Sequence, residues 1–239
     1  LDVEVLNITS KGSGNAYLCG NLSRGQIEFS GMGDLNINGT LSAQYLDVEM
    51  NGSGNIKISK PITIDTLEIE TSGMGNVDID GTIKIKVADI SMSGSGNING
   101  NSLHINNLNI ETSGMGNVNI DSFDGDNIAI TSSGSGNTTI EKLNSKDMQL
   151  SCSGLGDVEI KKGVATTAKI DYSGSGSLKA KGLSADNMQF VASGIGDHRI
   201  GEVKTLLDVK LRDKTSLTYS GNPASVKENI GKNAKLKKR

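Results

Sequence analysis

Apolar and polar residues alternate along most of this chain, and a short glycine motif interrupts the alternation at regular intervals. Ten copies of a Gly-x-Gly-Asn-like tetrapeptide recur every 19 to 21 residues between Gly12 and Asp197. An apolar period of two residues is typical of half-buried β-strands. Self-similarity at a fixed spacing of about 20 residues predicts a solenoid, in which each repeat buries its apolar face by stacking on its neighbours.

Alignment of the ten copies places the apolar residues in columns on both sides of the motif. Each column predicts a ladder of aliphatic side chains stacked inside the molecule. The columns after the motif are Leu35/Ile37, Ile56/Ile58, Val77/Ile79, Val118/Ile120 and Val158/Ile160. The columns before it are Leu46/Val48, Leu67/Ile69, Leu108/Ile110, Ile128/Ile130 and Met148/Leu150.

The same pattern excludes helices and antiparallel sandwiches. No segment between two consecutive motifs has the i, i+3, i+4 apolar spacing of a helix. Every repeat carries the same turn at the same phase, whereas a sandwich needs hairpins with varied turns. We expect an all-β fold, a single-stranded right-handed parallel β-helix of about eleven coils with about 20 residues per coil. A coil of 40 residues, with separate columns of Ser and Met motif centres, stays open.

The repeat runs almost from end to end and predicts one β-helix domain over residues 1–239. Residues 201–239 are expected to be degenerate C-terminal coils and a cap, because the glycines are lost there and charge increases. The net charge of −3 divides into −9 for residues 1–200 and +6 for residues 201–239. The basic end, residues 235–239, is expected to be a solvated and frayed terminus.

The composition argues against a nucleic-acid partner, a transmembrane segment and a disulfide. The chain has no aromatic residues interleaved with its basic ones, so we expect no nucleic-acid partner. It has no apolar run of 18 residues and therefore no predicted transmembrane segment. Cys19 and Cys152 lie six to seven coils apart, or ~30 Å at the ~4.8 Å strand spacing, which is too far for a disulfide. Cys152 is interpreted as a small buried hydrophobe.

The glycine motif has a functional and a structural interpretation. A calcium-binding turn would need an acidic residue at the last position, but six of the ten copies have neutral Asn there. We favour a structural corner, in which glycines permit positive φ and close backbone approach and stacked Asn side chains hydrogen-bond along the column and to the turn backbone. Whether any motif Asp binds calcium stays open.

The middle residue of the motif alternates between Ser and a large apolar residue. The residue two positions before the motif varies in the opposite sense in most copies: it is large before Ser53 (Met50) and small before Met74 (Thr71). We interpret the two positions as interdigitating neighbours of complementary volume.

Candidate catalytic groups are few. The two histidines, His104 and His198, lie on coils five motifs apart. The carboxylate pairs Asp78/Asp80 and Glu68/Glu70 have i, i+2 spacing, which places them on the outer face of a strand. We therefore assign no catalytic, cofactor-binding or metal-binding residue, expect no cofactor and no enzymatic activity, and leave the binding residues unknown.

The repeated Ser-Gly-Ser-Gly-Asn and Ser-Gly-Met-Gly-Asn motifs, and the ending Leu-Thr-Tyr-Ser-Gly-Asn-Pro at 217–223, resemble the auto-transporter adhesin, head GIN domain family. This family is found largely in Bacteroidetes. The resemblance covers nearly the whole chain. It implies an exported protein with a β-helical fold, often with a signal peptide or a lipid anchor. We expect the signal peptide to have been removed. It supplies no catalytic residues.

The sequence therefore predicts a non-enzymatic, extracytoplasmic β-helix protein at the cell surface, in the periplasm or secreted. It would act as an adhesin or macromolecular interaction module toward a host or envelope glycan or protein. The alternative is a carbohydrate-binding or polysaccharide-cleaving β-helix protein, and a third possibility is a structural envelope protein or oligomerisation module. The ligand, the oligomeric state and lipid anchoring stay open.

Overall fold

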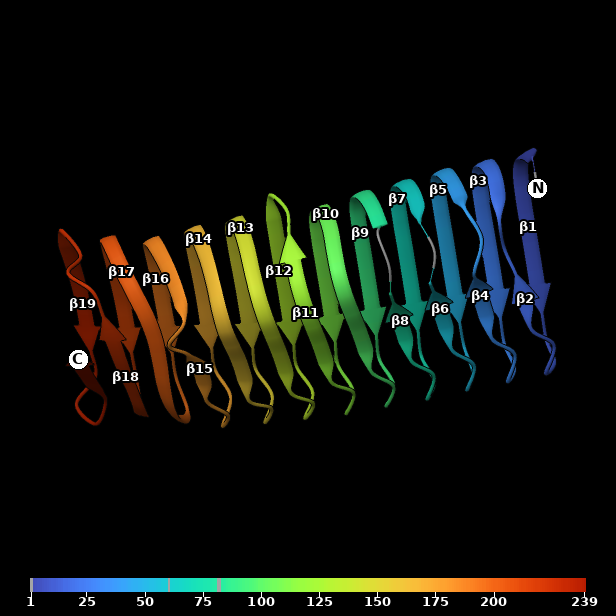
Figure 1. The fold of residues 1–239 in the computed structure, drawn as a ribbon. Helices are drawn as coiled ribbons and strands as arrows, with labels where there is room; N and C mark the ends of the chain where they lie inside the picture. Colours follow the sequence, from blue (N-terminus) through green and yellow to red (C-terminus); the bar gives the residue numbers. More distant parts are fainter. Residues whose placement is uncertain (1, 60, 81–82) are drawn as a thin grey trace.

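In a computed structural model, the chain winds into an elongated stack of parallel β-strands (Figure 1). The structure describes residues 2–59, 61–80 and 83–239, and this part of the chain contains no helix. About 12 turns follow one another, roughly 20 residues apart. The predicted all-β parallel solenoid is confirmed. The stack has about one turn more than the eleven expected. The coil of 40 residues is wrong, because successive turns lie roughly 20 residues apart.

The described residues form twenty strands, and many of the coils contain one short and one long strand. In the first half they are β1 (Asp2–Ser10), β2 (Ala16–Tyr17), β3 (Gly20–Phe29), β4 (Leu35–Ile37), β5 (Leu41–Met50), β6 (Ile56–Ile58), β7 (Ile62–Thr71), β8 (Val77–Ile79), β9 (Ile83–Met92) and β10 (Ile98–Thr112). In the second half they are β11 (Val118–Asp124), β12 (Asn127–Ser132), β13 (Thr138–Cys152), β14 (Val158–Tyr172), β15 (Leu178–Ala180), β16 (Leu183–Ala192), β17 (Ile195–Leu211), β18 (Lys214–Ser220), β19 (Ser225–Ile230) and β20 (Lys235–Lys238).

Strands pair with the equivalent strand one coil away, in continuous register except for shifts in the β16–β17 and β17–β18 pairs. Leu46 of β5 pairs with Leu67 of β7, which pairs in turn with Ala88 of β9. Two outer strand faces run along the stack. The pre-motif face consists of residues 24–29, 45–50, 66–71 and their equivalents, which lead into each motif. The post-motif face consists of residues 35–37, 56–58, 77–79 and their equivalents, which follow it.

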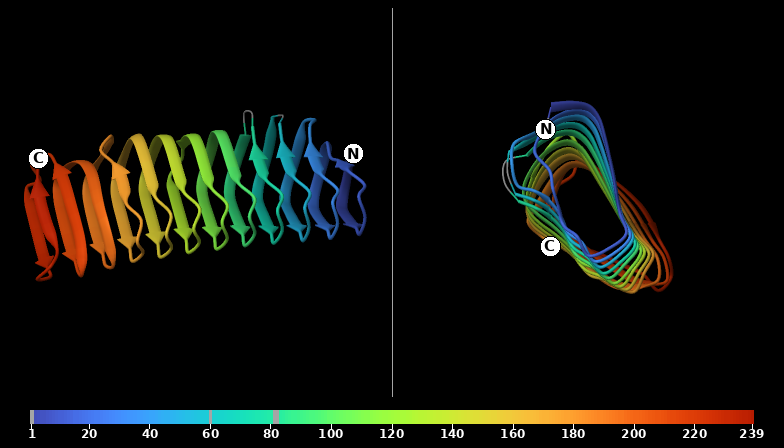
Figure 2. Two further views of the ribbon diagram at one scale, coloured as in Figure 1. Left: turned by 90° about the horizontal axis from the view of Figure 1, so that it is seen from below. Right: turned by 90° about the vertical axis from the view of Figure 1, so that its right-hand side faces the viewer.

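The core is a continuous apolar column along the stack axis. Viewed along the axis, the coils superimpose as a closed, elongated ring (Figure 2). All the aligned apolar residues predicted to point inward are buried in one cluster. Cys152 is also buried, as expected, and burial raises the pKa of its thiol to about 12.

The C-terminal region continues the stack. Leu207, Val209 and Leu211 are fully buried, and Leu236 packs against the core. The prediction of a frayed terminus is wrong, because β20 pairs with β18 through four residues of regular parallel register. The open edge of β18 presents unpaired backbone groups, and pairing with residues 235–238 satisfies them. Their side chains are largely solvated, as expected.

Candidate functional site

The ten motifs form one edge of the stack, here called the glycine corner. It consists of residues 12–15, 31–34, 52–55, 73–76, 94–97, 114–117, 134–137, 154–157, 174–177 and 194–197. From Met32 to Ile195, the backbone N–H of each middle residue donates to the carbonyl of the first glycine one coil earlier, as in Met74 to Gly52 at 3.1 Å and Ser95 to Gly73 at 3.0 Å. Successive motifs therefore stack directly on one another.

Glycine is needed at the corner because the stacked backbones approach closely. A Cβ built on Gly73 would overlap the carbonyl oxygen of Gly52, and most motif glycines from Gly31 to Gly176 meet the preceding coil in the same way. The expectation of close approach is confirmed. The expectation of positive φ is wrong for nine of the ten motifs, because Gly194 alone among the described motif glycines has it, at 93°.

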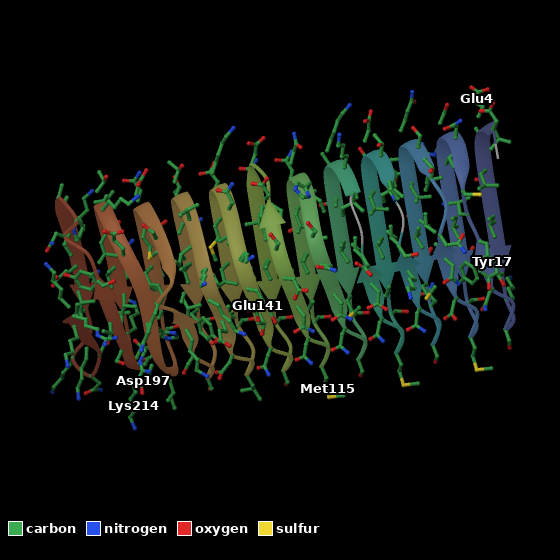
Figure 3. The ribbon with its side chains drawn as sticks, viewed as in Figure 1. Glu4, Tyr17, Met115, Glu141, Asp197 and Lys214 are labelled. Atoms are coloured by element: carbon green, nitrogen blue, oxygen red, sulfur yellow. The ribbon has the colours of Figure 1, made fainter. Side chains whose placement is uncertain are left out.

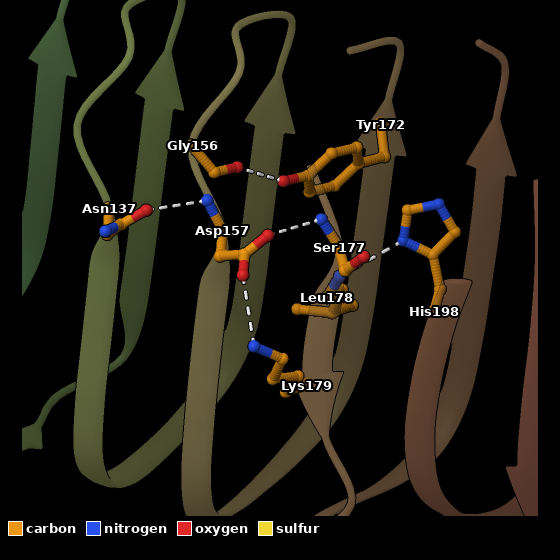
Figure 4. A network of polar contacts seen from close by, with 8 residues as sticks. All are labelled: Asn137, Gly156, Asp157, Tyr172, Ser177, Leu178, Lys179 and His198. Carbon is orange, nitrogen blue, oxygen red and sulfur yellow. Dashed lines mark hydrogen bonds and ion pairs between the residues drawn. The ribbon is translucent and has the colours of Figure 1, made fainter. Parts of the chain in front are cut away.

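The last motif position forms a polar ladder. The side-chain oxygen of Asn137 accepts the backbone N–H of Asp157 at 2.8 Å, and that of Asp157 accepts the N–H of Ser177 at 2.8 Å (Figure 4). The same bond recurs from Asn15 through each copy to this point. Asn and Asp are interchangeable here because both supply the accepting oxygen. The predicted Asn ladder is confirmed.

The pKa of the ladder residue Asp157 is set by opposing effects. Partial burial acts to raise the pKa of its carboxyl. The backbone N–H of Ser177 and the ammonium of Lys179, 3.0 Å away, outweigh that effect and lower the pKa. The carboxylate is thus held ionised by contacts within the protein, and its oxygens are engaged in the ladder.

The middle residues of the motif point into solvent. Met32, Met74 and Met115 are 68–70% exposed, whereas Met50, two positions before its motif, is buried. Met115 projects from the same edge of the molecule as Lys214 (Figure 3). The prediction that the two positions interdigitate is therefore wrong, because their side chains lie on opposite sides of the backbone. The large pre-motif residues fill space inside the stack, beneath the glycines.

A buried aromatic cluster lies beneath the corner where the ladder ends. The Tyr172 hydroxyl donates to the carbonyl of Gly156, and its ring centroid lies 4.8 Å from that of His198 (Figure 4). Phe190 also contacts the imidazole, with ring centroids 5.3 Å apart. His198 Nδ1 accepts the backbone N–H of Leu178 at 3.2 Å. Burial lowers the pKa of His198 to about 4, so this imidazole is neutral at physiological pH.

The sequence of this chain matches the profile of a known protein family. The profile described as "Putative auto-transporter adhesin, head GIN domain" matches twice, at residues 22–122 and 112–223. The chain belongs to the head GIN domain family. The overlapping matches fit a continuous repeat, since each match covers about five coils of one stack. Searches of curated proteins and of solved structures give no significant match.

Membership in the head GIN family associates the chain with adhesin-type modules at the cell surface or outside the cell. The described part of this head GIN chain has no helix of the length and apolarity that a membrane crossing requires. His104 is exposed and His198 is buried, so the structure does not bring the two histidines together. Within the described residues, no group of three or more His, Cys, Asp and Glu side chains is arranged to hold a metal ion.

The pre-motif face of the head GIN chain carries rows of carboxylates on its N-terminal coils. Glu28, Glu49 and Glu70 lie on β3, β5 and β7 in direct register. Beside them, the Tyr45 hydroxyl donates to Glu68 at 2.5 Å, and this hydrogen bond raises the pKa of Tyr45 to about 12. The i, i+2 carboxylates are therefore outward-facing, as predicted. Asp47 is crowded on this face, where burial and then the charge of Glu68 raise the pKa of its carboxyl.

Polar side chains also line a shallow groove across this face. The groove has a volume of about 230 Å³ and runs beside the glycine corner over five coils, from Asn51 to Ser133. Its outward lining is made of hydroxyl, carboxamide and carboxylate groups. They are Asn51, Glu70, Ser72, Ser91, Ser93, Glu111, Ser113, Thr131 and Ser133.

A second hollow, here called the basic notch, lies on the post-motif face near the C-terminus. It has a volume of about 650 Å³ and is lined by Lys181, Arg199, Lys237 and Arg239, with Tyr219 beside them. The five ion pairs among the described residues involve none of these four cations. Sequence reasoning missed the notch, although the outward post-motif positions change from Asn and Asp to Lys and Arg toward the C-terminus.

Proposed function

We propose that this chain is a non-enzymatic, exported or cell-surface adhesin-type module that binds a macromolecule along its outer strand faces. Family membership supports the cell-surface setting. The partner class is an extended glycan or polypeptide of the host or the bacterial envelope. A rigid stack presents the same polar positions again and again, which suits a polymer that also repeats.

The groove on the pre-motif face is the observation that carries this proposal. Its hydroxyl and carboxylate groups lie on successive coils, so equivalent groups recur at the ~4.8 Å spacing of the strands. Glu70 and Glu111 are two coils apart in one outward row, with Ser91 between them. Donors and acceptors at regular intervals can hydrogen-bond one polymer at several sites, and weak contacts then add up to useful avidity.

Binding to a glycan array and adherence of a deletion strain test the proposal. The double variant Glu70→Gln/Glu111→Gln is expected to lose most binding while it keeps the fold. The matched control is Glu159→Gln on the post-motif face, which is expected to bind like the wild type. A deletion strain with unchanged adherence, together with a wild-type chain that retains no array component, would refute the proposed function.

The basic notch favours a second candidate function, the binding of an acidic polysaccharide. Four cations that form no ion pair with another described residue gather in one hollow and create a positive potential that attracts polyanions. Tyr219 is the one aromatic residue among the described residues that line the notch, and it is buried, so this lining offers no exposed ring on which a nucleic-acid base could stack. A sulfated or uronate-rich glycan fits these groups best.

Retention on polygalacturonate compared with neutral dextran tests this second function. Binding is expected to weaken with salt and to fall at least tenfold in Lys181→Gln/Arg199→Gln, whereas Lys86→Gln on another part of the stack leaves it unchanged. Equal retention on both polymers would contradict the idea. Release of new reducing ends from the polysaccharide would show cleavage instead of simple binding.

A further inference from the structure

Half of the large apolar side chains that are exposed in the described part of the chain lie in a single row. These side chains are Met32, Met74, Met115, Leu155 and Ile195, and each is 61–70% exposed. They occupy the middle of every second motif at the glycine corner, and serine occupies the middle of each motif between them. We call these ten positions, from Ser13 to Ile195, the corner row.

The corner row has a fixed rhythm. Middle residues of successive motifs are joined through their backbones to the preceding coil, so their side chains follow one another at ~4.8 Å. Large side chains therefore recur at ~9.6 Å, with a shallow Ser and Gly hollow between each pair. Lys214 takes the same place in the next coil, bonded to Gly194 at 3.1 Å, and ends the apolar row with a charge.

A second copy of this chain has large side chains at the same spacing of two coils. We propose that the corner row is a homodimer interface, in which a second copy of this chain packs antiparallel against it. In a twofold dimer the same patch of both copies must be self-complementary. Ten positions that alternate strictly between small and large meet this condition when the two rows run in opposite directions at full overlap.

In that alignment every large side chain faces a serine of the other copy. The facing positions are Ser13 with Ile195, Met32 with Ser175, Ser53 with Leu155, Met74 with Ser135, and Ser95 with Met115. Five apolar side chains from each copy thus enter five hollows on the other. Such interdigitation gives the close packing that specific interfaces require.

The flanks of the corner row allow two copies to approach. Serine precedes the motif in most coils, and these side chains are short. On the other flank lies the Asn ladder, whose three aspartates all meet neutral residues in the antiparallel alignment. The facing residues are Asp34 with Ser177, Asp157 with Asn55, and Asp197 with Asn15. No pair of like charges therefore opposes the dimer along the row.

The size of the interface sets the expected affinity. The row spans nine coil steps, or ~43 Å, and a strip ~10 Å wide on both copies amounts to roughly 900 Å². That is close to the ~1,000 Å² at which specific interfaces begin. We therefore expect a dimer that forms at micromolar to tens of micromolar concentration and dissociates on dilution. The post-motif face and the outward carboxylates of the pre-motif face stay available to other partners.

Sedimentation equilibrium and disulfide trapping of the full chain test the proposal. The wild type is expected to be dimeric at about 100 μM, and Met74→Ser/Met115→Ser/Leu155→Ser, which copies the natural serine coils, is expected to be monomeric. Val164→Ser is the matched control, because Val164 is exposed but lies off the row, and it should dimerise like the wild type.

Disulfide trapping determines whether the two copies pack antiparallel or parallel. In a Cys19→Ser background, a mixture of Met32→Cys and Ser175→Cys chains should form an intermolecular disulfide, and a mixture of Met32→Cys and Ser53→Cys chains should not. The reverse result would mean parallel packing and would overturn the antiparallel dimer. A wild type that stays monomeric would overturn the interface. If that monomer bound phosphatidylcholine vesicles through the same three residues, the occupant of the row would be a lipid surface.

Discussion

The carboxamide oxygen of Asn76 accepts the backbone N–H of Asn97 at 2.8 Å, and the side-chain amide of Asn97 reaches the same oxygen at 3.3 Å. This N–H lies at a corner, where the backbone turns out of the regular strand ladder. Without the side chain of the preceding coil it would have no protein acceptor. The motif residue therefore stabilises the coil that follows it more than its own.

Two substitutions at Asn76 distinguish the contribution of the accepting oxygen to stability from that of the rest of the side chain. Asn76→Ala removes the acceptor and is expected to lower the free energy of unfolding by about 1–3 kcal/mol. Asn76→Asp keeps the oxygen, as Asp34 and Asp157 do naturally, and is expected to cost less than about 1 kcal/mol. Urea denaturation measures both. Equal losses in the two variants would mean that the hydrogen bond is not the important feature.

The close approach of stacked glycines makes a second prediction. A methyl group at Gly94 would overlap the carbonyl of Gly73, so Gly94→Ala must displace the backbone and is expected to lower the free energy of unfolding by more than about 2 kcal/mol. Gly14→Ala is the control, because nothing lies within 4 Å of its Cβ position, and a change within about 0.5 kcal/mol is expected. Thermal and urea unfolding would show whether the order is reversed.

The alternation of apolar residues was sufficient to predict most of the fold. If side chains alternate between inside and outside from Phe29 to Leu35, both of these residues point inward. The structure buries both. The same alternation places Met32 outside, so the exposure of the motif centres was available from the sequence. The complementary sizes of Met50 and the motif centre Ser53 instead predicted that these two positions touch. That prediction is wrong because side-chain volumes do not tell on which side of the backbone a side chain lies.

Other features depend on three-dimensional contacts that one sequence does not reveal. The basic notch joins Lys181 and Arg199 to Lys237, which requires β20 to pair with β18. Residues 235–239 are predicted from the sequence to be a solvated and frayed terminus, yet an open strand edge orders them. The position of His198 among Tyr172 and Phe190 likewise requires knowledge of the coil register.

The occupied oxygens of the polar ladder lead to a prediction about calcium. Each ladder oxygen from Asn15 to Asp157 already accepts a backbone N–H, and Lys179 neutralises the charge of Asp157. We expect the melting temperature to be the same, within about 1 °C, in millimolar calcium and in excess chelator. A calcium-dependent rise that the chelator abolishes would assign a cation site to the motif aspartates. Magnesium serves as the control for a general salt effect.

The buried imidazole of His198 should make stability depend on pH. Its pKa is lowered from 6.5 to about 4 in the folded chain. As the pH falls below 6.5, the unfolded chain takes up a proton that the folded chain still excludes. The contribution of His198 is therefore fully present above pH 6.5 and declines as the pH falls toward 4, by at most about 3 kcal/mol.

Replacement of this histidine tests the effect. His198→Leu, which copies Leu178 and Leu217 of the same column, should flatten the dependence of the free energy of unfolding on pH between 7 and 5. His104→Leu, at an exposed position, is the control and should keep the wild-type slope. Urea denaturation at closely spaced pH values measures the slopes. If the wild type and His198→Leu declined in parallel over this range, the protonation of other groups, and not burial of this imidazole, would control acid stability.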